Sequence, residues 1–280
     1  MIDDLARPRG PYSLALTARL AGDATRRFRD GHFVALLPDR AEAWQLPDGR
    51  VRLRAESEEA LETLRFVLAL DADHTEFVQR FRGDPLLGRT VQQLRGLRVL
   101  RVPTVAGALL RAVCGQLIDS KSARLLERRI VRAVSPAGGD GLYEPPGREA
   151  LGRLAPVELR KLGLAERKGA ALVRLCRSLD LERLRTVPTA AVVSRICRER
   201  GLGPWSAGVV CLEGLGRREH GLVGDLGLVK LLAILRGRWV EGWETAELLE
   251  PYGEWAGLAS VYMLAGFKDG TLPISRPLAA

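Results

Sequence analysis

Residues 196–207 read ICRERGLGPWSA. A helical pattern over Thr189–Arg200 stops at Gly201 and restarts at Pro204, which predicts two helices meeting in a tight glycine hairpin. Glycine permits the positive φ that such a turn needs, and the second helix begins with unpaired N–H groups. The stretch is typical of a phosphate-binding turn. A helix C-cap followed by a proline restart would give the same residues.

An aspartate follows one helix further along the chain. Asp225 comes directly before the apolar helix expected over Leu226–Leu235. Aspartate is a common N-cap, so capping alone explains its position. A catalytic carboxylate can occupy the same place, and the two roles do not exclude each other.

The rest of the chain divides into two patterns. Before residue 100, alternation over Tyr12–Leu20, His32–Leu37 and Val51–Ala55 predicts a small antiparallel sheet, and Ser57–Leu70 has helical spacing. After Pro103 the pattern is helical, interrupted by a Gly- and Pro-rich loop at 135–148. Helices are expected over Thr104–Cys114, Ser120–Val134, Pro156–Leu162, Glu166–Leu179, Thr189–Arg200, Pro204–Gly214, Leu226–Leu235 and Glu254–Phe267. We therefore predict a mainly α fold, with an α+β domain over 1–100 and a helical region over 101–280.

Composition narrows the classes of partner. The 280 residues are 46% hydrophobic and carry a net charge of +9, which excludes a disordered chain and favours a polyanionic partner. A codon bias towards arginine would produce the same surplus. No apolar run is long enough to cross a membrane and the start lacks a secretory pattern, so we expect a cytoplasmic protein. A monomer is also expected.

The residues that often bind metals are scattered. The four cysteines lie far apart within apolar helical patterns and are expected to be small buried hydrophobes. The three histidines form no group with metal-ligand spacing. We expect no metal site.

Four elements in order resemble one family. Gly201–Ala207 followed by Gly224-Asp225 resembles the helix-hairpin-helix, Gly/Pro-Asp superfamily of base-excision DNA glycosylases. Upstream, Gly115-Gln116-Leu117 resembles its Gly-Gln-Leu element and Leu162–Lys168 the start of its preceding helix, while Glu254-Trp255 resembles its Pro-Trp segment. The likeness covers roughly residues 100 to 268, and bacterial 3-methyladenine DNA glycosylase II is the most similar branch.

The resemblance implies a role for each element. An enzyme that acts on a base within duplex DNA must extrude it, so it needs a backbone anchor, a wedge and a catalytic group. Gly201, Leu202, Gly203 and Ser206 would hold a DNA phosphate, with a monovalent cation on the hairpin carbonyls compatible with that role. Leu117 would be the wedge beside Gln116, although a core leucine would fit the same helix face. Asp225 would stabilise the positive charge that develops on the sugar.

The base pocket follows from the same resemblance. Trp205 is expected to stack on a cationic alkylated base, unless it is an ordinary buried tryptophan. Where the family often has further aromatic residues, this chain has Val209, Leu226 and Leu264, which gives a more aliphatic pocket. The bifunctional members carry a nucleophilic lysine at the position of Trp205 and others carry an iron–sulfur cluster on cysteines after the catalytic domain. The resemblance thus implies a monofunctional glycosylase without a cofactor, acting on double-stranded DNA.

Three alternatives remain open at this point. The substrate could be a deaminated base such as uracil or hypoxanthine. The hairpin could serve a non-catalytic DNA-binding protein, which would leave Asp225 without a purpose beyond capping. An RNA-binding helical scaffold would explain the charge but not the spacing from Gly203 to Asp225.

Overall fold

The N-terminal part of the chain forms a five-stranded antiparallel sheet. In the computed structural model, which describes residues 1–273, the strand order is β1-β5-β4-β3-β2. Along β3 the side chains alternate, and Phe33, Ala35 and Leu37 point into a core closed by α2. The strands are β1 (Ile2–Ala6), β2 (Arg26–Arg29), β3 (His32–Leu37), β4 (Asp39–Gln45) and β5 (Val51–Ala55), and α2 covers Glu58–Val67.

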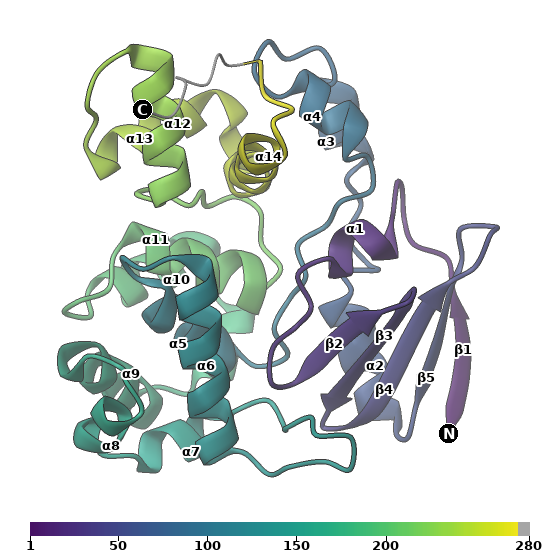
Figure 1. Ribbon diagram of the computed structural model, residues 1–280, viewed down its shortest axis with the longest axis vertical. Helices are drawn as coiled ribbons and strands as arrows, with labels where there is room; N and C mark the ends of the chain where they lie inside the picture. The colour runs from purple at the N-terminus through teal and green to yellow at the C-terminus, as the bar shows by residue number, and fades with distance from the viewer. Residues whose placement is uncertain (274–280) are drawn as a thin grey trace.

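The remaining helices form two lobes beside the sheet (Figure 1). In Figure 1, α5 to α9 lie below, α12 to α14 lie above with α3 and α4, and α10 and α11 lie between the two groups. Their bounds are α3 (Thr75–Phe81), α4 (Gly88–Gln93), α5 (Val105–Gly115), α6 (Ser120–Val134), α7 (Arg148–Arg153), α8 (Pro156–Lys161), α9 (Glu166–Ser178), α10 (Thr189–Cys197), α11 (Pro204–Val209), α12 (Leu226–Arg236), α13 (Thr245–Leu249) and α14 (Ala256–Asp269). A π turn over Val210–Gly214 continues α11, and 3₁₀ turns cover Leu181–Thr186, Gly242–Glu244 and Glu250–Trp255.

Polar side chains fix where several of these helices begin. The hydroxyl of Thr104 accepts a hydrogen bond from the amide of Gly107, and the carboxylate of Asp119 accepts from the amides of Lys121 and Ser122. Each bond satisfies an amide that would otherwise lack a partner in the first turn of a helix. These caps set the starts of α5 and α6, and the Asp119 cap also ends the short turn between the two helices.

Two buried clusters support the two parts of the chain. One lies between the sheet and α2, and the other runs through the helical lobes. Phe77, Phe81, Leu87 and Val91 belong to the helical cluster although they precede residue 100. The domain boundary near residue 100 stays a prediction, but the packing joins α3 and α4 to the helical core.

Buried ion pairs connect the two parts. The guanidinium of Arg111 on α5 contacts the carboxylates of Asp23, Glu127 and Glu213 at 2.8–2.9 Å. Asp23 also pairs with the buried Arg26. The two guanidinium groups lower the pKa of Asp23 even though burial alone would raise it. These ion pairs connect α5 to the N-terminal part of the chain. The turn that follows α5, residues 116–119, contains Leu117 and is called the wedge turn after the role predicted for that residue.

The structure confirms the mainly α fold with a small antiparallel sheet, and it corrects one strand. The segment Tyr12–Leu20, predicted as extended, contains the helix α1 (Leu14–Ala18). The hydroxyl of Ser13 caps this helix, and Leu14, Thr17 and Ala18 face the core. In such a short segment, helical spacing and alternation give similar apolar patterns. Among residues 1–273, no helix has the length and apolarity needed to span a membrane.

Candidate functional site

The predicted hairpin joins α10 to α11. Gly201 has φ +93°, a conformation that favours glycine, whereas Gly203 is extended with φ −143°. A Cβ atom built on Gly203 would meet nothing within 4 Å. Neither backbone strain nor packing within the protein therefore requires glycine at position 203. Open space beside a helix start suits the close approach of another molecule's backbone.

The turn between α5 and α6 presents Leu117 to solvent. Its side chain is 83% exposed and its φ is +57°, which costs a non-glycine residue about 1–2 kcal/mol. The interpretation of Leu117 as a core leucine is therefore wrong. An exposed apolar side chain held in a strained conformation is a candidate for a functional contact.

Gln116 connects this turn to the hairpin. Its side-chain amide donates to the carbonyl of Gly201 at 2.8 Å and to the hydroxyl of Ser206 at 3.1 Å. Lys168, from α9, donates to the backbone carbonyl of Gln116 at 2.7 Å. Ser206 is only 1% exposed, so in this structure its hydroxyl holds Gln116 and does not face solvent. The wedge turn and the hairpin form one connected unit.

Asp225 begins α12 and faces α11. One carboxylate oxygen accepts from the amide of Gly227 at 2.8 Å, and the other accepts from the indole N–H of Trp205 at 2.9 Å. The first bond is the expected N-cap. The second bond reaches across from the hairpin helix, and a cap does not need it. Two donors therefore fix the plane of a partly exposed carboxylate.

Trp205 lies between the wedge turn and Asp225. A Cβ atom on Gly115 would lie 2.8 Å from the ring atom Cη2, so glycine at that position makes room for the indole. The ring is half-buried and its N–H is used by Asp225. Its stacking on a base stays a prediction, whereas the structure shows it positioning the carboxylate.

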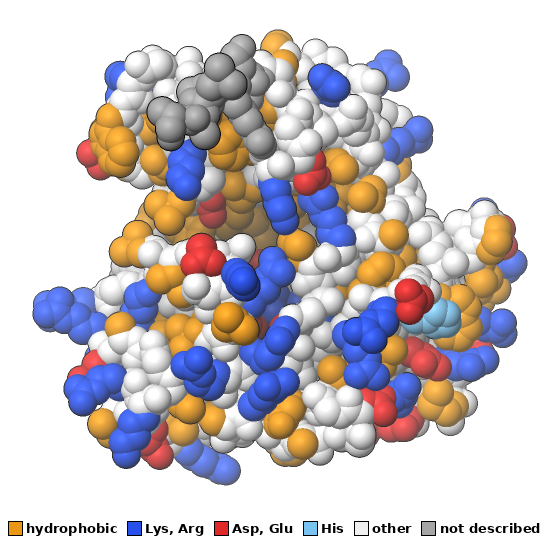
Figure 2. Space-filling model, in the orientation of Figure 1, with side chains coloured by type: hydrophobic (Ala, Val, Ile, Leu, Met, Phe, Trp, Pro, Cys, Tyr) orange, Lys and Arg blue, Asp and Glu red, His pale blue; other side chains and the backbone are white. Residues whose placement is uncertain are grey.

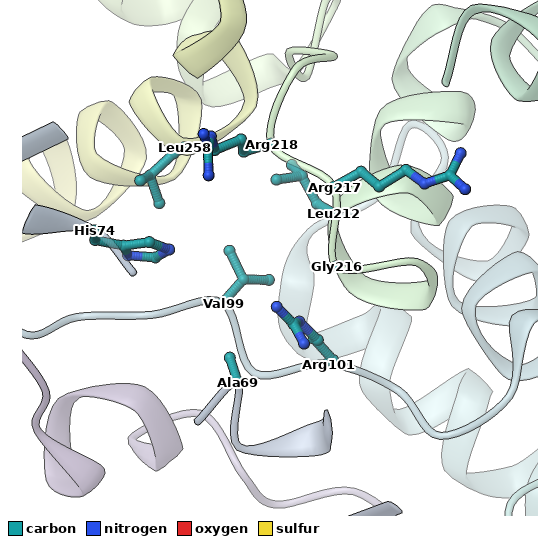
Figure 3. A pocket seen from close by; sticks show the side chains of 9 residues that line it. All are labelled: Ala69, His74, Val99, Arg101, Leu212, Gly216, Arg217, Arg218 and Leu258. Carbon is teal, nitrogen blue, oxygen red and sulfur yellow. The ribbon is translucent and has the colours of Figure 1, made fainter. Parts of the chain in front are cut away.

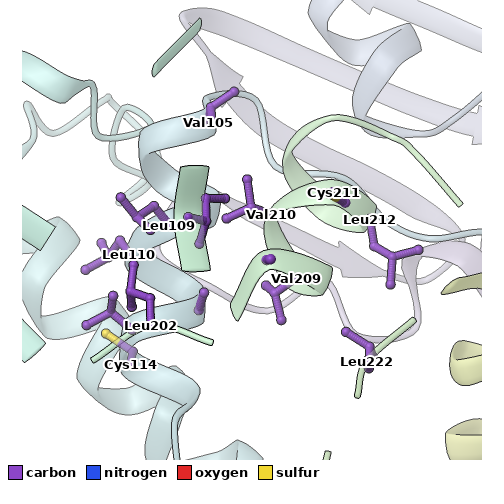
Figure 4. Close-up of a cluster of buried hydrophobic side chains, with 14 of the residues drawn as sticks. Val105, Leu109, Leu110, Cys114, Leu202, Val209, Val210, Cys211, Leu212 and Leu222 are labelled. Atoms are coloured by element: carbon purple, nitrogen blue, oxygen red, sulfur yellow. The ribbon is translucent and has the colours of Figure 1, made fainter. Parts of the chain in front are cut away.

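The three aliphatic residues predicted to line the base pocket do not all lie near Asp225. Leu226 is 47% exposed beside Asp225, and Leu264 of α14 packs against Gly227, where a Cβ atom would lie 2.5 Å from its Cδ2 atom. Val209 is buried in the helical core (Figure 4). In this structure Leu226 follows Asp225 directly, Leu264 lies against the first turn that Asp225 caps, and Val209 belongs to the core. Figure 2 shows a hollow between the two lobes, with hydrophobic side chains inside and basic ones along its edges.

His220 and the cysteines are structural. Nε2 of His220 lies 3.1 Å from the carbonyl of Pro204, and burial lowers the pKa of the ring. Cys114, Cys176 and Cys211 are buried, and Cys197 is partly buried. Burial raises the pKa of each thiol above its usual range. Within residues 1–273 no group of His, Cys, Asp and Glu side chains has the arrangement of a metal site.

Sequence reasoning missed an exposed aromatic pair. Trp239 is 76% exposed and Trp243 is 67% exposed, in the segment between α12 and α13. Their signal was the run Arg238-Trp-Val-Glu-Gly-Trp243, which holds two of the five tryptophans of a chain with only 5% aromatic residues. No helical or strand period singles them out. Lys168 was seen only as part of a motif, and its contact with Gln116 was not expected.

A small cavity lies elsewhere, where the segment after α2 meets the loop that follows the π turn (Figure 3). His74, Val99, Arg101 and Leu258 are among the residues that line it. In Figure 3 the side chain of Arg217 extends away from this space, and it bonds the carbonyls of Leu184, Arg185 and Val187. The cavity shares no residue with the group around Asp225.

Comparisons with known proteins agree with this geometry. No family model matches the chain. DNA-3-methyladenine glycosylase of Bacillus subtilis is 28% identical over 228 residues, which is 78% of this chain and 75% of that protein.

Solved structures share the fold over nearly the whole chain. The 3-methyladenine DNA-glycosylase of Archaeoglobus fulgidus superposes with a TM-score of 0.82 at 19% identity, covering 96% of this chain and 99% of that one. The 8-oxoguanine glycosylase/lyase of Clostridium acetobutylicum, bound to double-stranded DNA, gives 0.79 at 15% identity, covering 96% and 98%. The chain is therefore similar in sequence to a DNA-3-methyladenine glycosylase and shares its fold with DNA glycosylases of the superfamily that its motifs resemble.

Proposed function

We propose that the protein is a monofunctional DNA glycosylase that removes alkylated bases from double-stranded DNA and leaves an abasic site. The observation that carries the proposal is the carboxylate of Asp225, held by the amide of Gly227 and the indole of Trp205. A cap requires only the first donor. The second donor orients the carboxylate in a place where the hairpin and the wedge turn also converge. The name of the B. subtilis relative supports an alkylated substrate.

The hairpin and the wedge turn would prepare the DNA. Backbone amides at Leu202, Gly203 and the first turn of α11 would hold a phosphate, with the Gly203 position open to it. Leu117 would enter the stack and fill the space that the extruded nucleotide leaves. Because Gln116 binds the hairpin, anchoring the backbone would also fix the position of the wedge.

The chemistry itself is a hydrolysis. The bond between the sugar C1′ and the base nitrogen breaks, both electrons leave with the base, and positive charge develops on the sugar. Asp225 would stabilise this charge and orient a water molecule, whose oxygen bonds to C1′ while its proton is released. A base that carries a positive charge from alkylation leaves as a neutral molecule. The reaction as proposed uses no cofactor.

The absence of a lyase step is part of the proposal. A lyase of this superfamily needs an amine beside the sugar to form a Schiff base. At that position on α11 this chain has Trp205, whose N–H is engaged by Asp225. Lys168 is drawn to the carbonyl of Gln116 at 2.7 Å. Water is therefore the nucleophile in this proposal, and the enzyme is proposed to act in the cytoplasm as a monomer.

Base release from methylated duplex DNA tests the proposal. Wild type is expected to release 3-methyladenine or 7-methylguanine, and Asp225→Asn should lose release by orders of magnitude while it still binds a duplex with an abasic-site analogue. Strand cleavage after release, trapped by borohydride, would contradict the monofunctional mechanism. Release of uracil or hypoxanthine alone would keep the mechanism and change the substrate. Abasic-site binding without any release would leave a DNA-binding protein.

A further inference from the structure

The segment between α12 and α13 carries two tryptophans that face solvent although the segment is firmly held. Val240, between them, is 1% exposed, so it anchors the segment in the core. The carboxylate of Glu244 pairs with Arg236 and Arg238 and accepts from the amide of Glu241. A well-anchored loop that still exposes its two largest apolar side chains points to a contact with another molecule.

This segment adjoins the carboxylate site. The hydroxyl of Thr245 accepts from the amide of Gly224 at 2.8 Å and donates to the carbonyl of Gly242 at 2.7 Å. A Cβ atom on Gly242 would lie 3.4 Å from the Cα atom of Gly224. Gly242 precedes Trp243, and Gly224 precedes Asp225. The indole-bearing loop and the catalytic residue are thus fastened to each other through one buried threonine.

Exposed apolar side chains also occur near the site that holds Asp225. Among residues 1–273, the large exposed ones include Leu117 and Ile118 at the wedge turn, and Leu226, Trp239 and Trp243 around the start of α12 and the loop after it. The wedge turn lies beside the hairpin, and Trp205 connects that side to Asp225. Exposed apolar groups therefore occur on both sides of the same site.

We propose that Trp239 and Trp243 form a stacking surface for a nucleobase that has left the duplex stack, at the rim of the site that holds Asp225. The inference rests on the proposed glycosylase function and adds a second contact surface to it. Indole faces stack on any base, and each such contact contributes about 1–3 kcal/mol in proteins that bind unpaired strands. A base held here would be kept out of the duplex before it reaches the carboxylate.

A nucleobase fits this surface better than a protein partner does. Two indoles of about 250 Å² each, exposed to 76% and 67%, offer roughly 350 Å². A stable protein interface needs about 800 Å² from each partner. The net charge of +9 favours DNA as the molecule that presents this base.

Two measurements test the inference. In a duplex with 2-aminopurine at a mismatched position, wild type should extrude the fluorescent base and quench it by stacking. The double variant Trp239→Ala/Trp243→Ala should leave the base bright and bind the duplex roughly tenfold more weakly, which corresponds to about 1.4 kcal/mol. Phenylalanine at both positions should restore most of the quenching, and leucine should not. Leu235→Ala, an exposed residue of α12, and Trp44→Phe in the sheet are controls that should behave as wild type.

Several results would overturn the inference. Unchanged quenching and affinity in the double alanine variant would show that no base stacks there. A loss of self-association in sedimentation, with DNA binding unchanged, would assign the surface to a second copy of the chain. Failure of the proposed function has a different signature, because wild type would then release no base from methylated DNA whatever the tryptophan variants do. The alanine, phenylalanine and leucine variants all replace exposed side chains, so an unchanged melting temperature would show that each variant is folded.

Discussion

Trp205→Phe tests whether the indole N–H orients the carboxylate of Asp225, for which we propose the catalytic role. The substitution keeps an aromatic ring against Gly115 and removes the 2.9 Å hydrogen bond to Asp225. A hydrogen bond to a charged group contributes about 1.5–3 kcal/mol, and 1.36 kcal/mol is a tenfold change in rate. We therefore expect single-turnover release of 7-methylguanine from methylated duplex DNA to slow by roughly ten- to a hundredfold. Affinity for an abasic-site duplex should change little, because Asp225 still caps α12.

The control for this variant is another tryptophan. Trp255 is 1% exposed and its N–H has no hydrogen-bond partner, so Trp255→Phe shortens a buried ring without removing such a bond. It should lower the melting temperature and leave the release rate nearly unchanged. If Trp205→Phe releases bases as fast as wild type, the amide of Gly227 alone orients the carboxylate and the role given to Trp205 is refuted. A parallel loss of rate in both variants would indicate a general packing effect.

The other predictions concern the wedge, the hairpin and the domain junction. Leu117→Ala should leave the melting temperature unchanged, because the side chain is 83% exposed, but slow base release from duplex DNA at least tenfold; equal slowing on single-stranded methylated DNA would contradict a wedge. Gly203→Ala should fold normally and bind abasic DNA more weakly, with little change in salt dependence. Gly201→Ala should instead destabilise the fold by about 1–2 kcal/mol, because Gly201 has a φ of +93°. Unchanged DNA affinity in Gly203→Ala would disprove the phosphate contact. Burial lowers the pKa of His74 to about 4, so the unfolded chain takes up the proton first, and urea unfolding should show stability that is constant above pH 6.5 and falls by about 3 kcal/mol as the pH drops to 4. His74→Gln should remove that slope, and a slope that persists would assign it to other groups.

The sequence predicted most of the helical part because its signals were local, although α7 and α13 were not expected. Glycine at 201, proline at 204 and the Asp225 cap indicate the end of α10 and the starts of α11 and α12 without any knowledge of the tertiary fold. The strands were harder to predict. β4 (Asp39–Gln45) carries charged residues on its outer face and small alanines inside, and β2 (Arg26–Arg29) buries an arginine, so the apolar alternation of both strands is weak. They form because α2 and the neighbouring strands bury that inner face, and such burial depends on distant segments.

In the candidate site, too, local features could be predicted from the sequence and contacts between distant segments could not. Asp225 and the hairpin were found from spacing, since each is set by the helix that it begins or ends. The contacts that connect them were not, because Gln116 to Gly201 and Lys168 to Gln116 join segments far apart in the chain. Leu117 is a further case: its residue type is compatible with a core position, and only the left-handed backbone of the turn shows that it points outward. Residue type gave candidates, and backbone conformation decided between their roles.

The hydrogen bonds of Gln116 have a consequence for how lesions would be found. A hairpin that holds a phosphate fixes Gly201, and Gly201 holds the side chain of Gln116 at 2.8 Å. Leu117 is the next residue, so its distance from the DNA axis is set by the same contact that anchors the backbone. Moving along DNA would then carry the wedge at constant depth, and entry into the stack would depend on how easily each base pair opens. An alkylated or mismatched pair opens at lower cost, so in the proposed mechanism this connection would select damaged sites before the proposed pocket around Leu226 and Leu264 contacts the base. An aliphatic pocket is sufficient for such an enzyme, since much of the discrimination precedes it.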